Sequence, residues 1–268
     1  MGVLNITPDS FADGGRWLDP ARAADAALAM EAAGADIIDV GGESTRPGAE
    51  PLPVDEELAR VVPVLERLAG RLQAVISIDT YKARVAEAAL QRGAAIVNDI
   101  SALRYDPDLS QVIVRTGAAV VLMHNRGRSS TMYQQARYGD VACEVRDDLA
   151  ERLHASSEAG IPAGQVILDP GVGFAKRAEH SFAILARLPI LASLGRPLLV
   201  GPSRKSFLTA AIGDRHPDDR DWGTAAAVTM AALGGAHIVR VHAVGPMVDV
   251  IRTVDALRQA AADAGASP

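Results

Sequence analysis

The sequence predicts an α/β fold, a single (β/α)8 TIM barrel domain that spans residues 1–268. Eight short runs rich in Val, Ile and Leu recur along the chain, as expected for strands buried on both faces. A segment with helical character follows each run. Several of these segments end in Ala-Gly-Ala, Arg-Gly-Ala, Thr-Gly-Ala or Gly-Gly-Ala, where a glycine can cap the helix before the next strand begins.

The eight predicted strands are spaced as βα repeats require. They are GVLNIT (2–7), DIIDVG (36–41), AVISID (74–79), AAIVNDI (94–100), AAVVLMH (118–124), QVILDP (165–170), PLLVG (197–201) and HIVRVH (237–242). A doubly wound open sheet is the alternative, but it usually has fewer strands and one crevice. Eight βα units within about 260 residues therefore favour the barrel.

The predicted helices carry recognisable start and stop signals. The first has Asp19 as its N-cap, Pro20 at its first helical position and Gly34 at its end. The predicted helices are 19–35, 54–70, 82–94, 106–118, 139–160, 181–195, 221–236 and 246–265. The last ten residues, 259–268, are expected to fray.

Composition excludes several classes of protein. The net charge of −6 and the 4% of aromatic residues argue against a nucleic-acid partner, which calls for a basic surplus and stacking platforms. No apolar run reaches the roughly 18 residues of a membrane span. The single cysteine, Cys143, and an N-terminus without a signal-peptide pattern indicate a cytoplasmic protein without a disulfide framework.

Polar residues stand at the C-terminal ends of the predicted strands, where barrel enzymes place their chemistry. They are Asn5, Asp39, Asp79, Asn98, Asp99, His124, Asp169, Ser203, Arg240 and His242. An unpaired buried charge is costly, so a strand has no structural need for such residues. One of them alone could be a satisfied structural group, but their recurrence at every strand end predicts one polar pocket.

Alternation along the last strand places two of these residues together. Arg240 and His242 lie two positions apart and therefore share one face. Pointing into the barrel mouth, they would form a clamp for an anion such as phosphate. The alternative is that Arg240 pairs with an internal carboxylate.

The stretch LVGPSRKSFL (199–208) places Arg204 and Lys205 where the seventh strand leads into a helix. A lysine in the first helical turn opposes the helix dipole, so its presence favours a site for an anion or a polar ring over a solvated turn. Two Gly- and Pro-rich loops, 7–17 and 41–55, are candidate lids at the same end of the barrel. Ordinary connections are the alternative for each loop.

The strand-end motifs together resemble those of the dihydropteroate synthases, the enzymes of folate biosynthesis that sulfonamides inhibit. The motifs are GVLNITPDSFADGG, DIIDVGGESTRPGA, ISIDTYKARVAEAAL, AIVNDIS, VVLMHNRG, ILDPGVGFAK, LVGPSRKSFL and VRVHAV, in order from residue 2 to about residue 258. The resemblance implies that 6-hydroxymethyl-7,8-dihydropterin diphosphate and 4-aminobenzoate condense to 7,8-dihydropteroate and pyrophosphate. It also implies Mg²⁺ as the cofactor and a homodimer.

The resemblance assigns roles by matching motif positions. Pterin-binding positions are Asp79, Asn98, Met123, Asp169, Phe174, Gly201 and Lys205. Aminobenzoate-binding positions are Phe11, Thr45, Arg46, Pro47 and Ser206. Diphosphate-binding positions are Asn5, Arg240 and His242, with Asn5 also contacting Mg²⁺. The catalytic set is Asp13, Lys205, Arg240 and His242, in which Asp13 is expected to stabilise cationic charge.

Three competing functions remain open from the sequence. A methyltransferase that passes methyl from methyltetrahydrofolate to a corrinoid protein shares the barrel and the pterin site, but needs neither the Arg240–His242 clamp nor an aminobenzoate loop. A non-catalytic pterin-binding paralogue would have lost clamp or loop residues. A phosphosugar isomerase would show a Glu base and a Gly-rich phosphate loop.

One departure from the family concerns the start of the sequence. Family members usually carry a leader before the first strand, which often closes the bottom of the barrel, so an open bottom is one expectation.

Overall fold

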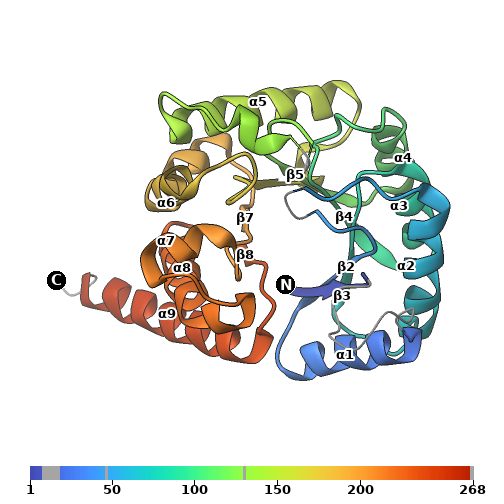
Figure 1. The fold of residues 1–268 in the computed structure, drawn as a ribbon, viewed down its shortest axis with the longest axis horizontal. Coiled ribbons are helices and arrows are strands. Elements are labelled where there is room, and N and C mark those ends of the chain that lie inside the picture. Colours follow the sequence, from blue (N-terminus) through green and yellow to red (C-terminus); the bar gives the residue numbers. More distant parts are fainter. Residues whose placement is uncertain (8–18, 46–47, 129–130, 266–268) are drawn as a thin grey trace.

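The computed structural model describes residues 1–7, 19–45, 48–128 and 131–265. Within these ranges a ring of strands is surrounded by helices (Figure 1). The strands are β1 (Gly2–Asn5), β2 (Ile37–Gly41), β3 (Val75–Asp79), β4 (Ala94–Asp99), β5 (Ala119–Met123), β6 (Val166–Asp169), β7 (Leu199–Val200) and β8 (Ile238–Val239). The helices are α1 (Pro20–Ala32), α2 (Val54–Leu68), α3 (Ala83–Leu90), α4 (Leu109–Thr116), α5 (Val141–Glu158), α6 (Ala178–Ala186), α7 (Thr209–Ile212), α8 (Asp221–Leu233) and α9 (Val244–Gly265).

The strands close into a barrel. β1 to β6 pair in sequence order and in parallel, and β7 pairs with β8. Two parallel bridges join the two sheets, Leu168 with Leu198 and Gly2 with Val241. The Val3 N–H also donates to the Val241 carbonyl at 3.0 Å. The predicted (β/α)8 barrel is therefore confirmed, and the open doubly wound sheet is wrong.

Alternate strand residues fill the barrel interior in layers. The lower layer is apolar and contains Ile96, Val121 and Leu199, packed against Met1, Ile37, Ala119, Ile167 and Ile238. Two residues further along the same strands, the next layer holds Asp39, Asn98, Met123, Asp169, Gly201 and Arg240. The apolar layer thus forms a floor, and the polar layer lies at the C-terminal ends of the strands.

Two predicted helices differ from the structure. The segment 181–195 is not one helix, because α6 ends at Ala186 and a 3₁₀ helix, η3 (Leu188–Leu194), follows. Pro189 is the physical reason, since it lacks the N–H that an α-helix would need there. After β7 the chain makes a single 3₁₀ turn, η4 (Ser206–Leu208), and the four residues of α7 instead of a full helix.

The last helix ends where the sequence predicts, at residue 265. α9 includes residues 259–265, which the sequence analysis also expected to fray. Alanine, the strongest helix former, dominates this stretch and offsets its exposure. Among the helices of the described ranges, none combines the length and the apolar character that a membrane crossing requires.

Candidate active site

A buried ion network joins four strands at the mouth of the barrel. The Arg240 Nε donates to Asp39 Oδ2 at 2.6 Å, and its Nη2 donates to Asp79 Oδ2 at 2.8 Å. The Asn98 side-chain amide donates to the same Asp39 oxygen at 2.9 Å. Asp39 is fully buried, and its other oxygen has no partner among the described residues. Arg240 therefore pairs with internal carboxylates, the alternative that the sequence left open.

The charges of this network are buried. Burial raises the pKa of Asp79 to about 7, opposed by Arg240 and reinforced by the negative charge of Asp39. Two carboxylates thus share one guanidinium. Arg240 has no hydrogen bond from its Nη1 to the described part of the chain, which leaves that nitrogen for a ligand in the mouth.

Across the mouth, Asp169 lies beside Lys205. Asp169 is 6% exposed, and its Oδ1 accepts a hydrogen bond from the Gly171 N–H at 2.7 Å. Burial raises the pKa of Asp169, and the positive charge of Lys205 opposes this shift. The Asp169 Oδ2 accepts no hydrogen bond from the described residues, so one carboxylate oxygen remains for a ligand that donates N–H groups.

The Lys205 side chain points into the barrel rather than to solvent. Its ammonium donates to the Val172 carbonyl at 2.5 Å and lies 4.5 Å from the centroid of the Phe174 ring. Burial lowers the pKa of Lys205 to about 8, opposed by the carboxylate of Asp169. A Cβ atom on Gly201 would lie 3.7 Å from Arg240 Cβ and 3.9 Å from Lys205 Nζ, so Gly201 keeps space between the two cations.

The residue before Lys205 explains this orientation. Arg204 has a left-handed backbone, with φ of 58°, and its guanidinium binds both oxygens of Asp221 at 2.8 and 2.9 Å. Its N–H donates to Thr224 Oγ1 at 3.0 Å. The expected helix N-terminus at Lys205 is wrong, because only a 3₁₀ turn begins there and no helix dipole of useful length forms. Ser206 is exposed on this turn.

An apolar wall lies beside these polar groups. Tyr81, Ile100 and Met123 are buried together, and Tyr105 and Phe174 pack against them. The Tyr81 and Tyr105 rings meet edge to face, with their centroids 5.2 Å apart. Met123 and Phe174 were predicted as pterin walls, whereas the two tyrosines were missed. The wall places aromatic and apolar side chains next to Lys205 at the mouth.

Buried polar groups stabilise the turn that follows β6. Gly171 has φ of +65°, and a Cβ there would come within 2.0 Å of the His124 carbonyl oxygen. Lys176 donates to the carbonyls of Gly171 and Phe174 at 3.1 and 3.2 Å, and its Nζ lies 2.7 Å from His124 Nδ1. The other nitrogen of His124 contacts Asp148 Oδ2 at 2.9 Å. His124 thus supports this turn from outside the predicted polar pocket.

Two further predicted residues stand at the rim. The Nδ1 of His242 lies 3.0 Å from Ser203 Oγ, and the His242 N–H donates to the same hydroxyl at 3.1 Å. Asn5 and Asp79 flank Gly41, since a Cβ on that glycine would lie 3.7 Å from Asn5 Oδ1 and 3.6 Å from Asp79 Oδ2. Asn5 therefore belongs to the same mouth as the Arg240 network.

The predicted loop residues are placed only in part. Thr45 is half-buried on the segment that follows β2. Phe11, Asp13, Arg46 and Pro47 lie outside the described residues. The sequence analysis did not identify the buried Lys82. Lys82 stands at the N-terminus of α3, and a lysine at an expected helix N-terminus was the feature that singled out Lys205.

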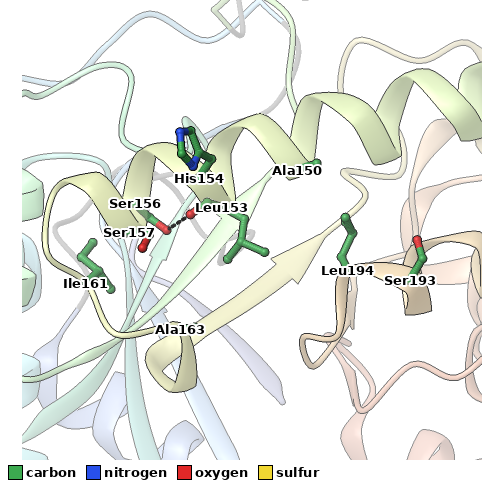
Figure 2. Close-up of a pocket in the computed structure, with 9 residues that line it drawn as sticks. All are labelled: Ala150, Leu153, His154, Ser156, Ser157, Ile161, Ala163, Ser193 and Leu194. Atoms are coloured by element: carbon green, nitrogen blue, oxygen red, sulfur yellow. Dashed lines mark hydrogen bonds between the residues drawn. The ribbon is translucent and has the colours of Figure 1, made fainter.

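A separate cavity of about 390 Å³ lies between the end of α5 and η3 (Figure 2). Leu153, Ser157 and Leu194 are among its lining residues. None of the lining residues is Asp, Glu, Lys or Arg. The lining residue Ala163 comes shortly before Val166, the first residue of β6. The cavity is therefore at the end of the barrel opposite the strand-end residues and is not the candidate site.

Comparisons with known proteins agree with this geometry. A family model described as pterin binding enzyme matches residues 1–242. A dihydropteroate synthase of Mycobacterium leprae is 47% identical over 262 residues, which cover 96% of this chain and 92% of that protein.

Solved structures give the same result. A Xanthomonas albilineans dihydropteroate synthase solved with 4-aminobenzoic acid superimposes with a TM-score of 0.90 at 40% identity, covering 100% of this chain and 93% of the other. A Yersinia pestis dihydropteroate synthase solved in a sulfonamide drug complex gives a TM-score of 0.91 at 40% identity, covering 96% and 93%. This chain belongs to the dihydropteroate synthase family of pterin-binding enzymes.

Proposed function

We propose that the protein condenses 6-hydroxymethyl-7,8-dihydropterin diphosphate with 4-aminobenzoate, giving 7,8-dihydropteroate and pyrophosphate for folate biosynthesis. The observation that carries this proposal is one mouth in which Asp169 and Lys205 face the Asp79–Arg240 pair, with an apolar wall beside them. A single cup of this kind fits a bicyclic heterocycle with a phosphorylated arm. The ligands of the solved relatives, 4-aminobenzoic acid and a sulfonamide drug, support the second substrate and sulfonamide binding.

The pterin ring would be held by its polar edge and its two faces. The Asp169 carboxylate can accept N–H bonds from the amino-pyrimidinone edge, and Lys205 can donate to the ring carbonyl and a ring nitrogen. Met123 and Phe174 would pack against the ring, and Asn98 and Asp79 would complete the edge contacts. Because these groups are already fixed by protein hydrogen bonds, little reorganisation accompanies binding.

The reaction breaks the bond between the pterin methylene carbon and the diphosphate oxygen and forms a bond from that carbon to the arylamine nitrogen. The electron-rich pterin stabilises the methylene cation, and Asp13 is proposed to assist. Arg240, His242 and Asn5 are proposed to receive the leaving diphosphate. The aminobenzoate contacts are proposed for Phe11, Thr45, Arg46, Pro47 and Ser206. The attached nitrogen loses its proton to water, so positioning and electrostatics dominate and no strong base is required.

Magnesium is the proposed cofactor. Among the described residues no group of three or more His, Cys, Asp or Glu side chains could hold a metal ion by itself. Mg²⁺ prefers oxygen ligands and is commonly held by one or two protein groups together with substrate phosphates. The Asn5 side-chain oxygen at the strand ends fits that role. When bound, the ion supplies positive charge that neutralises the leaving diphosphate.

A coupled pyrophosphate assay tests the proposed function. We expect pyrophosphate release only when the pterin diphosphate and 4-aminobenzoate are both present, and a large loss of rate when a chelator removes Mg²⁺. Each substrate alone is the control. Well-folded protein that binds the pterin but releases no pyrophosphate would instead be a non-catalytic paralogue.

We propose a homodimer formed through α8 and α9. Trp222, Met230 and Leu233 stand on one exposed face of α8 and are 86%, 47% and 55% exposed, and Leu257 on α9 is 65% exposed. These two helices pack side by side on one flank of the barrel (Figure 1). A second copy of this chain would cover large apolar side chains that a monomer leaves in water.

A single substitution tests the dimer. We expect Leu233→Arg to convert the protein to a monomer, because it places a charge in the proposed apolar interface. Light scattering measures the mass, and circular dichroism checks that the fold is retained. Arg252→Glu, on the exposed part of α9, is a control for a general change of charge. A monomeric wild-type protein would contradict the proposal.

The proposed compartment is the cytoplasm. The single cysteine, Cys143, is a free thiol, and disulfide frameworks are typical of oxidising compartments. This composition supports a reducing environment for the protein.

A further inference from the structure

A buried lysine joins two acidic residues near the end of β3. Lys82 stands before the first residue of α3 and is 7% exposed. Its ammonium donates to Glu43 Oε2, to Glu57 Oε2 and to the Leu52 carbonyl, each at 2.5 Å. All three of its N–H groups are therefore used within the protein, and none is left for a ligand.

The same cluster fastens the two ends of one segment. The Leu52 N–H donates to Glu43 Oε2 at 2.9 Å, while the Leu52 carbonyl accepts from Lys82. The Tyr81 hydroxyl donates to Glu43 Oε1 at 2.9 Å. Glu43 and Leu52, nine positions apart, are thus held at a single point. Thr45, one of the proposed aminobenzoate contacts, lies between them.

The cluster also contacts the apolar wall of the mouth. Tyr81, which binds Glu43 through its hydroxyl, packs with Ile100 and Met123 through its ring. The Lys82 ammonium lies 5.2 Å from the centroid of the same ring. Glu43 is therefore fixed relative to the wall beside the proposed pterin site.

Stability alone does not account for this cluster. The side chains of Lys82, Glu43 and Glu57 are only 9%, 10% and 1% exposed, and burial raises the pKa of Glu57 against the influence of Lys82. Removing such charges from water is costly, and apolar residues of the same volume often serve stability as well or better. Charged hydrogen bonds constrain the relative positions of their partners more strictly than apolar packing does. Such a constraint would hold Glu43 and Leu52 in place.

We propose that Lys82 and Glu43 are positioning residues for 4-aminobenzoate. Lys82 joins Glu43 to Leu52, and Tyr81 joins Glu43 to the apolar wall of the mouth. Thr45 stands two residues after Glu43, so these contacts position it, while Lys82 and Glu43 touch neither substrate themselves. This inference rests on the proposed function for the identity of the substrate. The clamp itself, between Lys82, Glu43 and Leu52, is independent of that identity.

The first test is Lys82→Met. We expect the KM for 4-aminobenzoate to rise about tenfold or more, because small displacements of a binding segment are costly, while the KM for the pterin diphosphate changes less than about threefold. Arg84→Met is the matched control, since the Arg84–Asp55 pair links the same two helices at exposed positions. We expect the control to leave both KM values unchanged. Equal rises of both KM values in Lys82→Met would overturn the inference.

A second variant separates positioning from stability. Lys82→Met leaves Glu43 and Glu57 without their cation and lowers the melting temperature. In the double variant Lys82→Met, Glu57→Leu, one of these carboxylates is gone, so the melting temperature should partly return while the KM defect for 4-aminobenzoate persists. Recovery of this KM together with stability would show a structural role only.

A third measurement does not require turnover. Hydrogen exchange of the Leu52 amide should accelerate about tenfold or more in Lys82→Met and not in Arg84→Met, because the clamp protects that N–H. Unchanged exchange would overturn the clamp even if the wild-type protein proved inactive. Inactivity of the wild-type protein with intact clamp behaviour would instead overturn the proposed function.

Discussion

We expect Asp169→Asn to lower the affinity for the pterin ring by at least about 100-fold. The Gly171 N–H donates to Asp169 Oδ1 and fixes which side-chain atom faces it. An asparagine would turn its oxygen toward that N–H and its NH₂ group toward the ligand. In the proposed binding mode the pterin edge presents N–H groups to this side chain, so one donor would face another donor in a buried site. Calorimetry with a bare pterin measures the loss.

The end of β4, which is separated from β6 by β5, offers a matched control. Asp99 is fully buried, but it faces away from the mouth and accepts the N–H groups of Ser101 and Leu103 at 2.7 and 2.6 Å. Asp99→Asn should lower stability and leave pterin affinity within about threefold of the wild-type value, since no ligand contact changes. If Asp169→Asn keeps its affinity, the ring is held elsewhere.

The layer of polar residues was predictable because strand alternation is a local property. Asn98 and Asp99 differ by one position, and the structure places the first against Asp39 in the mouth and the second in a turn outside it. A period of two residues is enough to decide this separation. The same rule placed Arg240 in the mouth.

The partners of these residues were not predictable, because they depend on register and closure. Asp39 and Arg240 are separated by 201 positions and meet only because Gly2 bridges Val241 and closes the ring. The contacts of Lys82 were not predictable for the same reason, since Lys82 meets Glu43 and Glu57 across 39 and 25 positions. A sequence shows that such a residue is anomalous at its position, as with Lys205, but does not show where its side chain turns.

Loss of Arg240 should destabilise the fold strongly. In Arg240→Met, Asp39 and Asp79 remain buried without their cation, and removal of one partner of a buried pair typically lowers the free energy of unfolding by ~3–5 kcal/mol. Urea denaturation at pH 8 measures this loss. Arg92→Met is the control, because the exposed Arg92–Glu66 pair should contribute several-fold less.

The deficit should shrink as the pH falls. The pKa of Asp79 is about 7 in the folded protein, above its unfolded value of 3.8, and loss of Arg240 raises it further. An acid with a raised folded pKa binds more protons when folded, so both proteins gain stability as the pH falls. The variant begins to gain at a higher pH, because its Asp79 pKa is the higher of the two, and its deficit is therefore larger at pH 8 than at pH 5.5. A deficit that is equal at pH 8 and pH 5.5 would show that lost packing, and not unpaired charge, causes the destabilisation.

Binding separates the proposed ligand role of Arg240 from its structural one. Two of its nitrogens hold Asp39 and Asp79, so only the remaining guanidinium edge can reach a diphosphate. We expect Arg240→Met to weaken the pterin diphosphate about tenfold more than a bare pterin, because one charge-assisted contact to phosphate is lost in addition to the common disturbance of the mouth. Calorimetry with both ligands at pH 6 measures the difference, since the variant is expected to be better folded there than at pH 8. Equal losses for the two ligands would assign Arg240 to the support of Asp39 and Asp79 alone, and the diphosphate would then depend on His242 and Asn5.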